Sequence, residues 1–123
     1  MGPNQTVEPG SACLRTLAYF AILANMDSKT SARYDARARI VKALAHPTRL
    51  FLVDQLSQGE QCVCRLAELV GADISTVSRH LALLRSAGIV TDDQRGTQVF
   101  YRLAMPCVLR FLGCVESMLK QAA

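Results

Sequence analysis

Two cysteines, Cys62 and Cys64, stand one residue apart and are the residues of this chain best suited to capture a soft ion. Thiolate sulfur binds soft metals and metalloids in preference to oxygen ligands. The 123-residue chain has five cysteines, an odd number with no evident disulfide framework. Such a pattern is typical of a protein in a reducing compartment, where thiols are buried filler, metal ligands or redox sensors.

The spacing of this pair restricts how it can act. In an ideal helix, positions i and i+2 point to nearly opposite sides, so both sulfurs reach one ion only if the helix begins or unwinds there. Gly59, just before the pair, favours such a break. As(III) and Sb(III) favour three thiolates, and a third sulfur must come from one of the remaining cysteines: Cys13, Cys107 or Cys114. Cys107 and Cys114 are seven residues apart and share a helix face, so they form a second site there or pack as small core residues at the dimer interface.

A second group of polar residues is placed to contact DNA. Apolar residues at Ile74, Val77, Leu81 and Leu84 recur at helical spacing and turn the residues between them outward. The predicted DNA-contacting residues are Ser75, Thr76, Ser78, Arg79, His80, Arg85 and Arg95. We expect Arg79 to bond a guanine edge or a phosphate, and Arg85, Arg95 and Arg102 to meet phosphates. His80 either touches DNA or packs beneath the helix.

The elements that must position these residues follow a regular order. Helices are predicted over residues 32–45, 47–56, 63–70 and 74–86, the last capped by Asp73 and ended by Gly88. Strands are predicted over residues 89–93 and 98–102, with a hairpin turn between them. A last helix opens at Pro106 and carries an apolar side: Val108, Leu112, Val115 and Leu119. The prediction is a mainly α fold with a small β-hairpin, a winged helix-turn-helix that dimerises.

The N-terminal part of the chain differs in composition. We expect residues 1–31 to be a flexible extension in which residues 13–24 can form a short helix, and residues 32–123 to be the folded domain. The apolar stretch 12–24 is too short to span a bilayer and contains Arg15, so we expect a cytoplasmic protein with no membrane partner. Lys and Arg outnumber Asp and Glu by 14 to 10, a mild excess that suits an anionic partner.

Four segments together resemble the ArsR/SmtB family of metal-responsive repressors: KALAHPTRLFLVDQL, CVCRLAELV, STVSRHLALLRSAGIV and the hairpin strand QVFYRL. The resemblance runs from about Arg37 to Leu103, and more loosely through the last helix. It implies a homodimer built on the first and last helices. It also implies that the protein represses by binding operator double-stranded DNA, and that an inducer weakens this binding.

The resemblance also assigns roles to single residues. His46 falls in the structural ALAHPTR signature, and Ser75, Ser78, Arg79 and His80 match the S-x-x-S-x-H pattern of the DNA-contacting helix. Cys62 and Cys64 match a Cys-Val-Cys element that members sensing arsenite, antimonite, cadmium or lead use as ligands. Cadmium or lead sensors add an N-terminal cysteine, here matched by Cys13.

Two departures narrow the prediction. The third cysteine of the commonest arsenic sensors is replaced by Ala67, and residues 104–120 contain no Asp or His for the zinc site on the family's last helix. The predicted function is therefore a repressor of arsenic resistance, released when As(III) or Sb(III) binds Cys62 and Cys64, with Cys13 or Cys107 as candidate third ligand. Cd(II) or Pb(II) is the alternative inducer.

Three other hypotheses compete with this one. The same fold can sense oxidants or sulfide through its thiols, although a Cys-Val-Cys spacing within a helix is poor for a disulfide. A DNA-binding module without an inducer is a second alternative. An enzyme such as a thiol oxidoreductase is a third, and it is disfavoured because the sequence has no C-x-x-C, no Cys–His pair at motif spacing and no carboxylate dyad.

Overall fold

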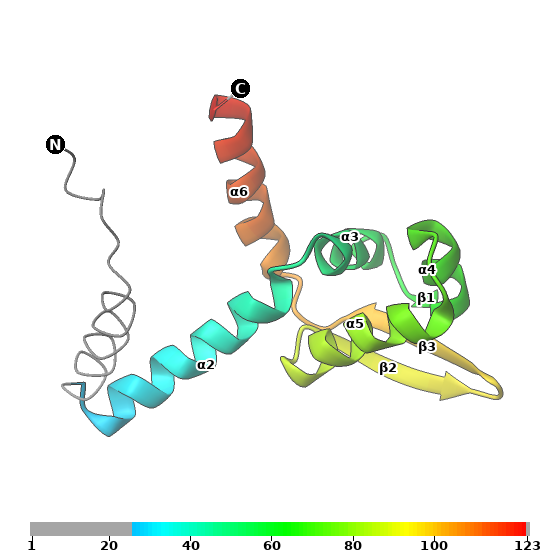
Figure 1. The fold of residues 1–123 in the computed structure, drawn as a ribbon, viewed down its shortest axis with the longest axis horizontal. Helices are drawn as coiled ribbons and strands as arrows, with labels where there is room; N and C mark the ends of the chain where they lie inside the picture. The colour runs from blue at the N-terminus through cyan, green and yellow to red at the C-terminus, as the bar shows by residue number, and fades with distance from the viewer. Residues whose placement is uncertain (1–25, 123) are drawn as a thin grey trace, which may run out of the picture. The chain divides into compact units, whose positions relative to one another are not determined.

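The computed structural model describes residues 26–122, which form helices and a small antiparallel sheet (Figure 1). In chain order the elements are α2 (Ser28–Leu44), α3 (Pro47–Leu56), β1 (Gln61–Cys62), α4 (Val63–Val70), α5 (Ile74–Ser86), β2 (Val90–Arg95), β3 (Gln98–Leu103) and α6 (Val108–Ala122). The chain divides after Arg37 into two units, and the second contains α3 to α6. The predicted mainly α fold is confirmed. Cys13 and the predicted helix 13–24 lie outside the described residues.

The helices α3 and α4 begin and end where the sequence predicts, because local caps fix their ends. Pro47 occupies the first turn of α3, where its missing N–H costs no hydrogen bond. The Nδ1 atom of His46 accepts a hydrogen bond from the Thr48 N–H at 3.1 Å. The end of α4 is set by Gly71, whose φ of +78° is a conformation that glycine adopts without strain.

Two helix boundaries differ from the prediction. The first helix begins at Ser28 rather than at residue 32, because Asp27 caps it with its side chain, 3.3 Å from the Thr30 N–H. The last helix begins at Val108 rather than at Pro106, because the chain first makes a tight turn in which the Val108 N–H bonds to the Met105 carbonyl at 3.1 Å.

The sheet has the strand order β1-β3-β2, and all its pairings are antiparallel. The β2–β3 hairpin, which we call the wing, is longer than predicted because its loop has only two residues between the paired Arg95 and Gln98. Gly96 opens that loop with a φ of +65°, as a tight hairpin requires. The strand β1 is not predicted from the sequence, since two residues carry no periodic signal.

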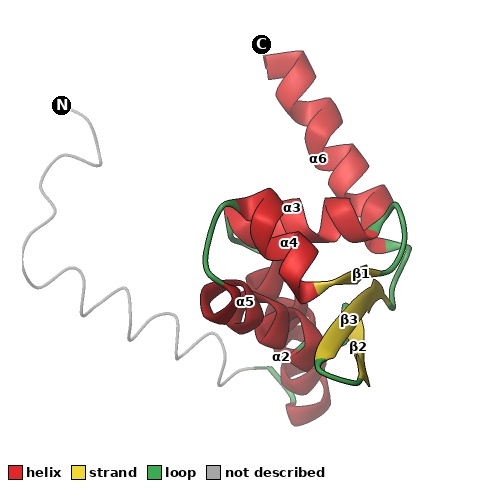
Figure 2. Cartoon of the chain, turned by 90° about the vertical axis from the view of Figure 1, so that its right-hand side faces the viewer, coloured by secondary structure: helices red, strands yellow, loops and turns green. Residues whose placement is uncertain are grey.

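The core is formed by apolar side chains from every described helix and both long strands. It contains Leu44, Leu52, Val53, Leu56, Leu66, Ala67, Val77, Leu81, Leu84, Ile89, Val90, Tyr101 and Val108. Figure 2 shows the sheet beside the α3–α5 helices and α6 leading away from them. Accordingly only the start of α6 joins the core, and Met118 and Leu119 are 69% and 61% exposed.

Within residues 26–122, every helix is too short or too polar to cross a membrane.

Two neighbouring leucines of α5 test this core. Leu84 is fully buried and Leu83 is 52% exposed. We expect Leu84→Ala to lower the free energy of unfolding by about 2–5 kcal/mol, because it removes buried methyl groups and leaves a cavity. Leu83→Ala, the matched control, should change it by less than about 0.5 kcal/mol. Urea denaturation at one fixed chain concentration measures both, and equal losses would contradict the assigned rotation of α5.

Candidate nucleic-acid interface and thiol pair

The helices α4 and α5 form a helix-turn-helix, and the outer face of α5 carries the residues predicted to contact DNA. Val77, Leu81 and Leu84 are fully buried, whereas Ser75 and Arg79 are exposed. Ile74 was predicted to belong to the buried stripe, and this is wrong: as the first residue of α5 it is 52% exposed, so the buried stripe begins one turn later. The polar face of α5 is therefore free of the chain's own core.

Asp73 holds the start of α5 and engages two of the predicted DNA-contacting residues. Its carboxylate accepts hydrogen bonds from the Ser75 hydroxyl, from the Thr76 hydroxyl at 2.6 Å and from the Thr76 N–H at 3.3 Å. The hydroxyl bonds from Ser75 and Thr76 lower the pKa of Asp73 to about 2. Both hydroxyls thus use their protons within the chain but keep acceptor lone pairs for a partner.

The side chain of His80 packs on the inner side of α5. Of the two predicted roles, contact with DNA or packing beneath the helix, the structure shows the contacts of the second. The His80 ring lies 4.5 Å from the ring of His46, and its Nδ1 atom lies 3.3 Å from the guanidinium of Arg49. Burial lowers the pKa of His80, and the charges of His46 and Arg49 lower it further. The ring is therefore held in its neutral form, in which a ring nitrogen can accept a hydrogen bond from Arg49.

Arg49 was not singled out from the sequence, yet it links three helices. Its Nε atom donates to the Ala43 carbonyl at 2.6 Å, and a second guanidinium nitrogen lies 3.4 Å from the Lys42 carbonyl. Arg49 itself belongs to α3, and its contact with His80 reaches α5. The last turn of α2 is thereby connected to the helix that carries the candidate DNA-contacting residues.

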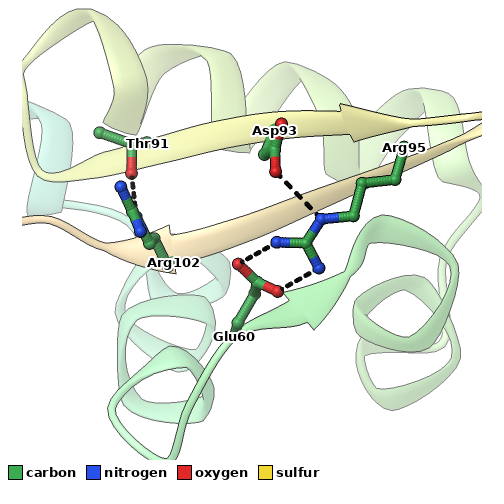
Figure 3. A network of polar contacts seen from close by, with 5 residues as sticks. All are labelled: Glu60, Thr91, Asp93, Arg95 and Arg102. Carbon is green, nitrogen blue, oxygen red and sulfur yellow. Dashed lines mark hydrogen bonds and ion pairs between the residues drawn. The ribbon is translucent and has the colours of Figure 1, made fainter.

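The predicted phosphate-binding arginines occupy different environments. Arg85 forms a 2.6 Å ion pair with Asp92, and Arg95 is paired with both Glu60 and Asp93. Arg102 donates to the Thr91 hydroxyl at 3.1 Å (Figure 3). Within residues 26–122, Arg79 forms no salt bridge. Of the predicted arginines on α5 and the wing, Arg79 and Arg102 are therefore the two that form no ion pair with a described carboxylate.

Sequence reasoning missed the carboxylates that hold these arginines. Asp93 and Arg95 are two residues apart in one strand, so period-2 alternation places them on the same face and signals their pairing. Glu60 is 35 residues from Arg95, and it precedes a strand that has no sequence signal. Nothing in the sequence points to that contact.

The cysteines Cys62 and Cys64, which we call the thiol pair, are joined by a disulfide with their Cα atoms 5.4 Å apart. The spacing is expected to disfavour a disulfide within a helix, and this bond forms because Cys62 lies just outside one. The helix begins at Val63, so Cys62 has an extended backbone (φ −78°, ψ 153°) and its sulfur turns toward Cys64. The helix thus begins between the two cysteines, which is the condition that the sequence sets for both sulfurs to reach one ion.

The structure does not bring the other described cysteines to this pair. Cys107 and Cys114 are exposed, unbonded thiols at the start of α6 and within it. Cys114 is predicted to pack as a small core residue at the dimer interface, and this stays a prediction because its exposure is that of a single chain. In the part of the chain that the structure describes, no three His, Cys, Asp or Glu residues gather into a metal site. Among the described cysteines, the two sulfurs that meet are therefore those of Cys62 and Cys64.

Comparisons with known proteins decide the family. A model described as "Bacterial regulatory protein, arsR family" matches residues 46–92. The solution structure of a homodimeric winged helix-turn-helix DNA-binding domain from Mycobacterium bovis, a possible ArsR-family regulator, is 34% identical with a TM-score of 0.69, over 80% of this chain and 92% of that domain. This chain belongs to the ArsR family. The family is one of DNA-binding transcriptional regulators, not of enzymes, as the sequence predicts.

Two curated repressors are similar to the central part of the chain. The transcriptional repressor SmtB of Mycobacterium tuberculosis is 40% identical over 70 residues, which are 57% of this chain and 52% of SmtB. The arsenical resistance operon repressor of Escherichia coli is 45% identical over 67 residues, which are 54% of this chain and 57% of that repressor. The chain thus spans about half the length of these curated relatives.

The lowered pKa of His80 gives this ArsR-family protein a predicted pH dependence. In the unfolded chain the imidazole of His80 binds a proton near pH 6.5, and in the folded chain it does so only at lower pH. The contribution of neutral His80 to the free energy of unfolding is therefore complete above about pH 6.5. It is lost as the pH falls below that value.

His80→Asn keeps an acceptor facing Arg49 but cannot be protonated in this range. We expect its melting temperature to fall a few degrees less than that of the wild type between pH 7 and pH 5, measured by circular dichroism. Identical losses would show that His80 does not titrate in the way its surroundings imply.

Proposed function

We propose that this protein is a transcriptional repressor that binds operator double-stranded DNA as a homodimer and is released by As(III) or Sb(III) at the thiol pair. Membership of the ArsR family and the helix-turn-helix formed by α4 and α5 support the DNA-binding role. In this proposal α5 enters the major groove, where base edges are distinguishable, and presents Ser78 and Arg79 from its outer face. The wing lies along the sugar-phosphate backbone of the DNA, where Arg102 adds positive charge.

The homodimer is supported by apolar residues that the single chain leaves uncovered. On α6, Phe111, Val115, Met118 and Leu119 are 39–69% exposed, and Val41 on α2 is 52% exposed. Apolar side chains gathered on one helix are typical of an interface. The Mycobacterium bovis domain, which resembles this chain, is homodimeric. Dimerisation through α2 and α6 would present two copies of α5 to a two-fold related operator.

The observation that carries the inducer proposal is the meeting of two sulfurs where α4 begins. Cys62 and Cys64 would hold the ion, and Cys13 or Cys107, from the same or the partner subunit, would supply the third thiolate that As(III) favours. Because thiolate sulfur also binds the soft ions Cd(II) and Pb(II), these are the alternative inducers. Because α4 packs on α5, with Leu66 and Leu81 both fully buried, a change at the first turn of α4 reaches the DNA-contacting helix. Similarity to the arsenical resistance operon repressor favours the metalloid.

The disulfide favours a second candidate, a repressor that senses oxidants. In this case the two thiols lose two protons and two electrons to an oxidant such as a peroxide, and the bond between Cys62 and Cys64 forms as the oxidant is reduced. Because the two sulfurs already lie side by side in the structure, forming the disulfide requires no large movement of the backbone. Both candidate functions use Cys62 and Cys64, and they differ in whether a metalloid ion or an oxidant reacts with the thiol pair.

The deciding experiment measures operator binding by fluorescence anisotropy. Reduced protein is titrated separately with arsenite, antimonite, cadmium, lead and zinc, and in parallel with diamide or peroxide. We expect a thiophilic ion to weaken DNA binding by about 5–150-fold, the range of a typical coupling free energy. Cys62→Ser should abolish the response, whereas Cys114→Ser, the matched control on α6, should retain it.

Each outcome assigns the sensor differently. Release by As(III) or Sb(III) that Cys62→Ser removes supports the metalloid proposal. Release by diamide alone replaces it with the oxidant sensor. DNA binding that no ion and no oxidant disturbs would leave a repressor without a thiol-based inducer.

Arg79 tests the DNA-contacting role of α5. We expect Arg79→Ala to weaken operator binding by about 1–3 kcal/mol, the discrimination that a good base contact provides. Arg110→Ala removes the same charge from an exposed position on α6 and should have little effect. Anisotropy titrations with operator and with scrambled duplex separate the two roles of Arg79. A loss confined to the operator indicates a base contact, an equal loss on both indicates a phosphate contact, and no loss contradicts the proposed face.

A further inference from the structure

Arg95, near the tip of the wing, is held by three hydrogen-bonded contacts that use most of its donors (Figure 3). Its two terminal nitrogens bond the two carboxylate oxygens of Glu60 at 2.6 and 3.0 Å, and its Nε atom bonds Asp93 at 3.0 Å. The guanidinium also lies over the Phe100 ring, 4.7 Å from its centre. Bidentate pairing is the strongest geometry that arginine offers, and a phosphate would need the same donors.

The residue that holds Arg95 is next to the thiol pair. Glu60 directly precedes β1, in which Cys62 is paired with Phe100 of β3, the same ring on which Arg95 lies. The side chain of Gln61 donates to the Gln55 carbonyl at 2.9 Å, which fastens β1 to α3. The backbone position of Cys62 therefore helps to determine where the carboxylate of Glu60 lies relative to the wing.

We infer that Glu60 is a gate on the wing: with Cys62 and Cys64 joined, it keeps Arg95 from binding DNA phosphates. This inference rests on the proposed function and deepens it, since it supplies a route from the thiol pair to DNA besides the packing of α4 on α5. The side chain of Arg95 is 50% exposed and that of Glu60 is 31% exposed, so the pair lies at the surface where a duplex could compete for it. Glu60 also repels phosphate directly, by its own charge.

The inference predicts a change in the salt dependence of DNA binding. A phosphate contact releases counterions whatever the base sequence, so a fluorescent mixed-sequence duplex serves as the probe and the operator need not be known. In the diamide-oxidised protein, Glu60→Gln frees the two terminal nitrogens of Arg95 from their ion pair. We expect tighter binding and a slope of log K against log salt that is steeper by about 0.9 for each wing, and so about 1.8 for a dimer. In the reduced protein the difference should be smaller.

Three further full-length variants make the test specific. Glu116→Gln removes the same charge from an exposed position on α6, so it controls for net charge and should leave the slope unchanged. Arg95→Gln should abolish the effect of Glu60→Gln, so the double variant should bind like oxidised wild type or more weakly. Circular dichroism melts establish that each variant folds.

The outcomes separate this inference from the proposed function. The gate is overturned if oxidised Glu60→Gln matches wild type in affinity and slope, or if the double variant keeps the gain in binding. Wild type that binds the duplex and is released by arsenite upholds the proposed function in either case, whereas release by diamide alone replaces it with the oxidant sensor. Wild type that does not bind DNA, or whose binding ignores every thiol reagent, overturns both.

Discussion

The burial of one apolar stripe on α5 is the constraint on which the rest of the structure depends. Val77, Leu81 and Leu84 are fully buried among side chains from the other helices and from β2. Protein interiors are close-packed, so such a stripe leaves a helix little freedom to rotate. Rotation by a single residue, about 100°, would bury Ser78 and expose Leu81. The direction of the polar face is therefore a consequence of core packing.

Apolar packing alone would still allow α5 to shift in position. Polar contacts restrict this movement. Asp73 fixes the first turn through Ser75 and Thr76, and the contact between Arg49 and His80 connects the middle of the helix to the end of α2. These contacts are directional, whereas apolar packing is not. A helix that is fixed in both rotation and position can present its outer side chains to a base edge with the accuracy that hydrogen bonding requires.

The helices of the fold could be predicted from the sequence because local signals set their ends. The ion pairs of the arginines could not be predicted because they depend on tertiary contacts. Pro47, Asp73 and Gly71 each act on the nearest turn of chain, so the bounds of α3, α4 and α5 follow from their caps. The face of α5 that carries Arg79 follows from periodicity. The partners of Arg85 and Arg95 do not, because an exposed arginine pairs with whichever carboxylate the fold brings near. Glu60 reaches Arg95 only because β1, a strand of two residues, joins the sheet.

The thiol pair shows how two residues acquire a function that neither has alone. Cys62 is at once a strand residue paired with Phe100, the cap of α4 and one half of the disulfide. Its sulfur accepts a hydrogen bond from the Arg65 N–H at 3.4 Å while it is bonded to Cys64. Thiol chemistry at this sulfur therefore changes the acceptor on which the first turn of α4 depends.

The same chemistry acts on the strand that carries Glu60, since β1 ends at Cys62. A cysteine placed one turn later in α4 would share neither the cap nor the strand, and its modification would remain local. The one-residue spacing of the pair is useful because a strand ends and a helix begins between the two sulfurs.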